Sequence, residues 1–154
     1  MKWILRVQRA FLASPIRWPS SGSTSFDSAS STNLPGSDGF TTQVYQGGAG
    51  TFRNLSQPEN AAQANTAGQG FIGLHAVSDD GHLVVFGTAA SALGATPGDD
   101  HGPHTAVVAR DIVTGTTTVV ASGNGGSDSA SVDAAGTKVA FISNATDLPG
   151  GATD

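Results

Sequence analysis

The chain contains no cysteine, so disulfide bonds and thiolate metal sites are excluded and the redox state of its compartment is left open. It also lacks an uninterrupted run of about eighteen apolar residues, so no membrane span is predicted. Charged residues make up only 12% of the sequence against 38% hydrophobic ones, which is too apolar for a typical disordered chain. A length of 154 residues is enough to bury one ordinary core.

Basic residues are scarce and unevenly placed. Those of the first 18 positions are Lys2, Arg6, Arg9 and Arg17. The rest of the chain sets only three basic residues against all 12 acidic ones. A body of that charge repels phosphate backbones, so nucleic acid is not expected as a partner.

The N-terminal segment 1–21 allows three interpretations. It begins like a secretory signal, but Arg6 and Arg9 interrupt its apolar stretch. It also has an apolar side that would suit an interfacial helix, although Pro15 and Pro19 would cut that helix short. The third interpretation is a frayed end. We expect residues 1–21 to lie outside the fold and assign them no function.

Glycine is abundant, with 21 residues, and part of the sequence repeats itself. The segment Val77–Asp99 aligns without a gap on Val132–Asp154, 55 positions later, with seven identities in 23 pairs. Chance would give roughly one or two. A fainter copy is "TNLPG" at 32–36, which matches "TDLPG" at 146–150 in four of five places. Such spacing indicates a repeat architecture in which each unit packs against its neighbours.

Each complete unit is predicted to hold four strands. In the first unit these are expected at 70–77, 82–88, 105–110 and 116–122. An Asp-Gly turn at 78–81 joins the first two strands, and the turn 111–115 joins the last two. The Gly-rich and Pro-rich stretch 92–104 is expected to be a loop, and the polar segment 123–128 a connector to the next unit.

The second strand of this unit is apolar on both faces. Val84 and Phe86 share one face, while Leu83 and Val85 share the other. We therefore expect it to be covered on both sides, which stacked four-stranded units would achieve. The sequence predicts an all-β fold, a partial β-propeller made of four-stranded antiparallel blades. A β-sandwich is the alternative, but it does not predict a repeat in phase.

These residues resemble the TolB-type, WD-like β-propeller repeat family. The resemblance lies in Ser78-Asp79-Asp80-Gly81 with Val84 and Phe86, then in "ARDIVTGTTTVVAS" from Ala109, and in the loop "NLPG" at 33–36 and "DLPG" at 147–150. It extends from Phe26 to Asp154. This chain departs from the pattern at Thr105 and Ala106, where the family usually has an acidic residue, and at Ala134 and Ala135.

If the chain follows this family pattern, residues 22–154 form an incomplete propeller domain. It would consist of a partial blade at 22–56, a full blade at 70–122 and a partial blade at 129–154. Closed propellers use roughly four to eight blades, so such a chain would be a fragment, a degenerate remnant or a piece that assembles with other copies.

The resemblance implies a non-catalytic scaffold that is periplasmic or secreted and that binds protein or glycan partners on loops such as 93–104. The alternative is the propeller accessory domain of a hydrolase or peptidase whose catalytic domain is missing here. Open blade edges would also allow self-association. No cofactor is expected.

The densest polar cluster is "GDDHGPH" at 98–104. Asp99 and Asp100 offer oxygen ligands to Ca²⁺, and His101 with His104 offers imidazoles to a transition metal. The segment lacks the alternating acidic residues of a calcium loop. It also lacks a third ligand for a transition metal, so a solvated loop is the simpler interpretation. We predict no metal site and no catalytic residue, because the sequence holds no nucleophile elbow, phosphate-binding loop or dinucleotide fingerprint.

Four further polar residues receive structural interpretations. Asp79 and Asp80 are better explained by turn chemistry, since the second copy keeps Gly136 and loses both acids. His75 and His82 flank this hairpin and are interpreted as surface or satisfied core residues.

Overall fold

The computed structural model describes residues 24–28, 34, 42–48, 51–57, 70–73, 75–99 and 102–148, and these form strands in small antiparallel sheets. The only helical element in this part of the chain is a single 3₁₀ turn, η2 (Ser91–Leu93). The expected all-β class is confirmed. Within these ranges no helix has the length and apolar character needed to cross a bilayer. Segment 1–21 lies outside the described residues.

The central sheet has four antiparallel strands in the order β4-β5-β8-β9. They are β4 (Gly70–Phe71), β5 (Leu83–Thr88), β8 (Ala106–Asp111) and β9 (Thr117–Ala121). The order follows the chain, as short turns between β-branched runs dictate. β4 is shorter than the predicted strand 70–77, of which only a single bridge from Val77 to Val84 is added. His75, with φ of 55°, breaks the strand because a left-handed residue cannot continue a β-ladder.

β5 lies in the interior of the molecule. Phe86 pairs with Val108 of β8, and both are completely buried. Val84 and Phe86 belong to one core cluster, and Val85 belongs to another, on the opposite face. The prediction that this strand is covered on both sides is confirmed.

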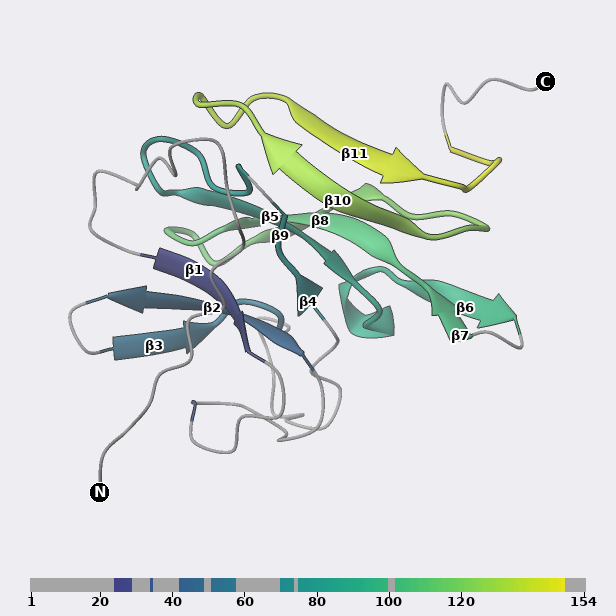
Figure 1. The fold of residues 1–154 in the computed structure, drawn as a ribbon, viewed down its shortest axis with the longest axis horizontal. Helices are drawn as coiled ribbons and strands as arrows, with labels where there is room; N and C mark the ends of the chain where they lie inside the picture. Colours follow the sequence, from purple (N-terminus) through teal and green to yellow (C-terminus); the bar gives the residue numbers. More distant parts are fainter. Residues whose placement is uncertain are drawn as a thin grey trace, which may run out of the picture.

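Two smaller sheets cover the two faces of the central sheet (Figure 1). The first has the order β1-β2-β3, with β1 (Thr24–Ser28), β2 (Gln43–Gly48) and β3 (Thr51–Asn54). The second consists of β10 (Ser127–Val132) and β11 (Val139–Ser143). Val44 and Leu55 pack on the face of Phe86, while Ala130 and Val132 pack on the face of Val85.

The two repeat copies have equivalent surroundings. Phe86 points from the central sheet into the cluster shared with the β1-β2-β3 sheet, and Phe141 of β11 packs against the cluster shared with the central sheet. Leu93 packs in the same cluster as Phe86, and Leu148 packs against the same cluster as Phe141. Each unit therefore presents its Phe and Leu to the unit before it, which is what an in-phase repeat requires.

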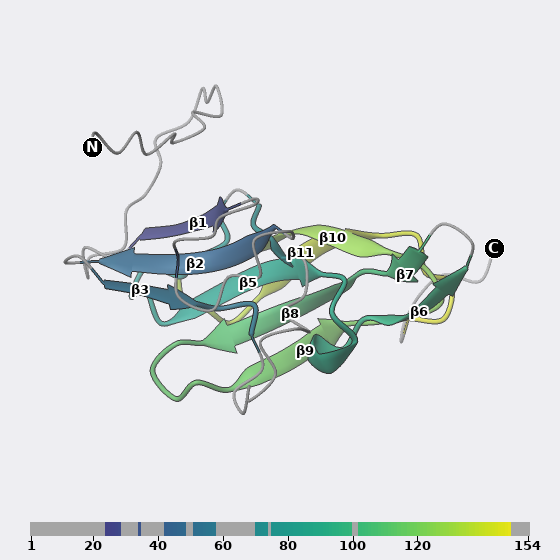
Figure 2. The same cartoon turned by 90° about the horizontal axis from the view of Figure 1, so that it is seen from below.

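The predicted loop 92–104 is partly ordered as strands, which corrects the expectation. Thr96–Asp99 (β6) and Gly102–His104 (β7) pair as an antiparallel hairpin with an irregular register. This hairpin lies at the end of the molecule opposite the turn between β8 and β9 (Figure 2). Thr96 is tied down because its Oγ1 donates a hydrogen bond of 2.7 Å to the carbonyl of Gly123. Thr96 and Gly123 are 27 positions apart, so a local sequence pattern does not indicate this contact.

The connector between the units is also shorter than predicted, since β10 begins at Ser127. The backbone N–H of Ser127 donates to the carbonyl of Thr105 at 2.9 Å, and its hydroxyl donates to Ser143 Oγ at 2.8 Å. Residues that appeared too polar for a strand are thus held by hydrogen bonds to the neighbouring strands.

Candidate binding site

A pocket with a volume of about 340 Å³ lies between the β4 edge of the central sheet and β10. Its lining residues come from the segment after β4, from the position just before β8 and from β10; they are Ile72, Gly73, Thr105, Asp128 and Ser129. Asp128 and Ser129 are exposed, so the pocket opens to solvent on the side of β10.

The wall on the β10 side is a β-bulge. The register of β10 against β11 shifts between Asp128 and Ser131. Ser129 within this bulge has φ of 53°, a left-handed conformation that costs a non-glycine residue roughly 1–2 kcal/mol. Such conformations cluster at ligand sites, where the surrounding structure over-determines them. The bulge turns the side chains of Asp128 and Ser129 away from regular strand positions.

The opposite wall depends on the absence of a side chain at Gly73. A Cβ there would lie 2.7 Å from the carbonyl oxygen of Ala130, closer than real contacts allow. Two positions further on, the carbonyl of His75 accepts a hydrogen bond of 2.8 Å from the N–H of Val132. Gly73 and His75 therefore lie directly alongside β10, and at position 73 only glycine permits this approach.

Thr105 lines the pocket and fixes the start of β10. Its side-chain hydroxyl accepts a hydrogen bond of 3.1 Å from the N–H of Ser127, in addition to the bond that its carbonyl accepts. The resembled family usually has an acidic residue near this position. Threonine here provides a hydroxyl in place of a charge.

The pocket offers one carboxylate, two hydroxyls and the apolar side chain of Ile72. This combination suits a small polar ligand that presents hydroxyl groups and a C–H face, because the polar groups fix orientation and the apolar wall provides contact.

The metal hypothesis for Asp99 to His104 finds no support in the part that is described. His104 lies in β7 and pairs with Thr96 of β6. Asp100 and His101 are outside the described residues, and the side chain of Asp99 is too. Among the residues that the structure describes, no three His, Cys, Asp or Glu side chains are grouped closely enough to hold a metal ion.

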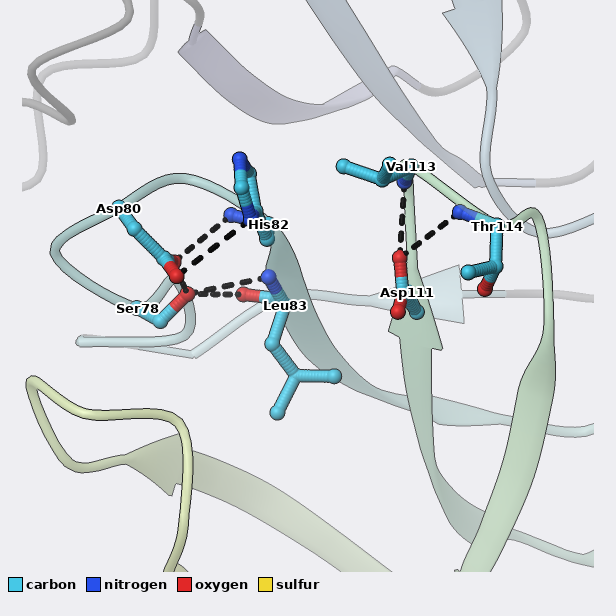
Figure 3. Close-up of polar contacts among 7 residues, drawn as sticks. All are labelled: Ser78, Asp80, His82, Leu83, Asp111, Val113 and Thr114. Atoms are coloured by element: carbon cyan, nitrogen blue, oxygen red, sulfur yellow. Dashed lines mark hydrogen bonds and ion pairs between the residues drawn. The ribbon is translucent and has the colours of Figure 1, made fainter.

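Asp80 carries out turn chemistry, as predicted (Figure 3). Asp80 Oδ1 accepts hydrogen bonds from the Ser78 hydroxyl at 2.6 Å and from the His82 N–H at 3.0 Å. These two bonds, in that order, lower the pKa of Asp80 from its ordinary value of 3.8. His82 is exposed and its Nδ1 lies 3.5 Å from Asp80 Oδ2, and His75 is exposed as well.

Arg110 and Asp111, which form the Arg-Asp pair in "ARDIVTG", also have structural roles. Asp111 Oδ1 accepts from the N–H groups of Thr114 at 3.0 Å and Val113 at 2.8 Å (Figure 3), and these bonds lower its pKa from 3.8. Arg110 is 3% exposed, and its Nη1 donates to Thr117 Oγ1 at 2.5 Å. Both side chains hold the β8–β9 hairpin together.

None of the five pocket residues was singled out from the sequence as a binding residue. One local signal was present, since a glycine inside an apolar strand pattern indicates a close backbone approach or a bulge. The remaining residues meet only through the packing of β10 on the central sheet. Comparisons of the chain with family models, with curated proteins and with solved structures found no match.

Proposed function

We propose that this chain is a β-propeller repeat scaffold with a non-catalytic, binding function, and that the pocket beside β10 holds part of a glycan or a similar hydroxyl-rich ligand. The observation that carries the proposal is the equivalence of the two repeat copies. Phe86 and Phe141, 55 positions apart, both pack against the preceding sheet. Rigid units stacked in this way position their connecting segments accurately, which is what a binding scaffold needs.

The arrangement of the inner segments supports a blade-like relation. Gly73 and His75 lie beside Ala130 and Val132 in the same order, so these two inner segments run in the same direction. Neighbouring antiparallel units whose innermost strands run parallel would place the pocket at the inner side of the repeat array. A hydroxyl-rich ligand there would be read by Asp128, Ser129 and Thr105, with Ile72 against its C–H face.

The test is an NMR titration of ¹⁵N-labelled protein with three probes: N-acetylglucosamine, mannose and maltose. We expect one of them to shift the amide resonances of Ile72, Gly73, Thr105, Asp128 and Ser129. Asp128→Asn should weaken that binding by about tenfold, the effect of losing one charge-assisted hydrogen bond. Asp79→Asn, which changes an exposed carboxylate at a hairpin turn, is the matched control. Shifts absent from all five pocket amides for every probe would contradict the proposal.

A further inference from the structure

The connector between β9 and β10, residues 122–126, is bonded to two loops. On one side the hydroxyl of Ser122 donates a hydrogen bond of 2.6 Å to the carbonyl of Gly94, in the loop after η2. On the other side the carbonyl of Gly126 accepts a hydrogen bond of 3.0 Å from the N–H of Asn144, in the loop after β11. The connector therefore fixes the positions of both loops.

Asn124 makes most of the bonds on the side of β11. Its Nδ2 donates to Thr146 Oγ1 at 2.9 Å, and its Oδ1 accepts from the Thr146 N–H at 2.9 Å. Its backbone N–H donates to Asp147 Oδ1 at 2.8 Å. We call these three bonds the Asn124 clamp. Asn124 and Thr146 are both exposed, so water reaches the clamp.

Asn124 precedes Gly125, and this is the only Asn-Gly pair in the sequence. The main-chain nitrogen after an asparagine can attack the side-chain carbon Cγ, and glycine favours this attack because it has no Cβ and the freest backbone. The N–Cγ bond forms, the N–H proton passes to water, and Nδ2 leaves as ammonia. Water then opens the succinimide ring to give aspartate or isoaspartate. Among the described residues the Gly125 N–H has no hydrogen-bond partner, so this nitrogen is not engaged elsewhere.

The folded structure slows this reaction. Gly125 is buried, and a Cβ built on it would lie 2.6 Å from Asn144 Oδ1 and 2.7 Å from the nitrogen of Ala145. The loop after β11 thus lies directly on the residue that supplies the attacking nitrogen. Because the reaction expels Nδ2, the bond from Nδ2 to Thr146 must also be lost. The rate is therefore set by local opening of the clamp.

The products of the reaction do not fit the clamp. An aspartate at position 124 places a second carboxylate beside Asp147, whose Oδ1 accepts the N–H of residue 124, and the like charges repel. An isoaspartate places an additional methylene group in the backbone before Gly125. The carbonyl of Gly126 is then displaced from the N–H of Asn144. Either product weakens the attachment of the loop after β11.

We propose that Asn124 is a site of spontaneous modification, at which conversion to aspartate or isoaspartate, controlled by Thr146, releases the loop after β11 from the connector. The reaction consumes only water and needs no other protein. The site shares no residue with the pocket, so the inference goes beyond the proposed binding function and does not rest on it.

The modification is measured by peptide mapping of the full chain after increasing times at neutral pH. Trypsin releases residues 111–138, in which Asn124 is the only asparagine. Mass spectrometry detects the exchange of NH₂ for OH, and labelling by an isoaspartate methyltransferase identifies the isoaspartate form. We expect conversion at Asn124 and none over the same time at Asn144, which is also exposed but precedes Ala145.

Three variants test the control by Thr146. Thr146→Ala should raise the rate about fivefold, because the loss of a hydrogen bond makes opening easier. Thr146→Ser keeps the hydroxyl and is the matched control, with the rate of the original chain. Asn124→Gln should abolish the modification, because ring closure from the longer side chain is much slower.

Release of the loop is measured on Asn124→Asp by amide hydrogen exchange. We expect the amides of Asn144 and Thr146 to exchange about tenfold faster than in the original chain. The amide of Phe86, which lies in the central sheet, should exchange at an unchanged rate and so shows that the variant is folded.

Four results would overturn the proposal. These are an Asn124 that stays intact, equal conversion at Asn144, an unchanged rate in Thr146→Ala, and unchanged exchange at both loop amides in Asn124→Asp. None of them bears on the saccharide titration, whose readout is at the pocket amides, so the two proposals fail separately.

Discussion

The backbone N–H of Asp79 donates a hydrogen bond of 2.9 Å to the carbonyl of Ala134, the residue 55 positions later in the repeat. The two hairpin turns of the repeat are therefore bonded to each other at equivalent positions. Within each turn the same bonds recur, since the N–H of Leu83 donates to Ser78 Oγ at 3.0 Å and that of Lys138 donates to Asp133 Oδ1 at 2.9 Å. The repeat in the sequence is thus a repeat in hydrogen bonding as well as in packing.

Replacing Gly81 with alanine tests the turn. Gly81 has φ of 73°, and Gly136 at the equivalent position has φ of 68°. A side chain in this left-handed region costs about 1–2 kcal/mol, so Gly81→Ala should lower the free energy of unfolding by that amount in a urea titration. Gly87→Ala is the control, because its Cβ would meet atoms no closer than 3.7 Å. Equal losses in both variants would contradict the assigned turn conformation.

The two equivalent phenylalanines should contribute unequally to stability. Phe86 is completely buried between two sheets, so Phe86→Ala should cost about 3–5 kcal/mol. Phe141 is only partly buried, because β11 carries no further strand among the described residues, and Phe141→Ala should cost clearly less. Ile142→Ala, at a position 67% exposed, should change the unfolding free energy little. Chemical denaturation of the three variants measures this order, and a larger loss at Phe141 than at Phe86 would disprove the stacking described here.

Three turn carboxylates make stability depend on acid. Hydrogen bonds from backbone and hydroxyl groups lower the pKa values of Asp80, Asp111 and Asp133 from 3.8. Because the unfolded chain then binds protons more readily than the folded one, this stabilisation is complete above the unfolded pKa and is lost as the pH falls through the folded values.

Thermal unfolding from about pH 6 to about pH 2 should show a fall in midpoint that becomes smaller when all three residues are replaced by asparagine. Asparagine keeps an acceptor oxygen but does not titrate. A triple variant with the slope of the original protein would refute the role of these turns.

The bulge at the pocket gives a prediction of its own. Ser129 has φ of 53°, and a β-branched residue is strained there more than serine is. Ser129→Val should therefore lower the unfolding free energy by about 1–2 kcal/mol, whereas Ser129→Gly should leave it unchanged or slightly higher. Since Ser129 is exposed, lost burial does not enter the comparison. Differential scanning calorimetry of both variants would settle it, and a stable Ser129→Val variant would contradict the bulge geometry.

Local patterns predicted much of the fold. The Asp-Gly turn before Leu83, the two apolar faces of β5 and the phase of the repeat all follow from neighbouring residues, and the structure has each of them. The hairpin β6–β7 and the early start of β10 were missed. Both depend on hydrogen bonds between residues that are 22 or more positions apart, such as those of Thr105 with Ser127 and of Thr96 with Gly123.

By itself the sequence determined the strand-and-turn chemistry and the 55-residue period, because propensity, turn residues and alternation act over a few neighbouring positions. Only the tertiary structure decided where Gly73, Thr105 and Ser129 meet. A pocket is a product of how sheets pack across long sequence separations, and no local pattern encodes that arrangement.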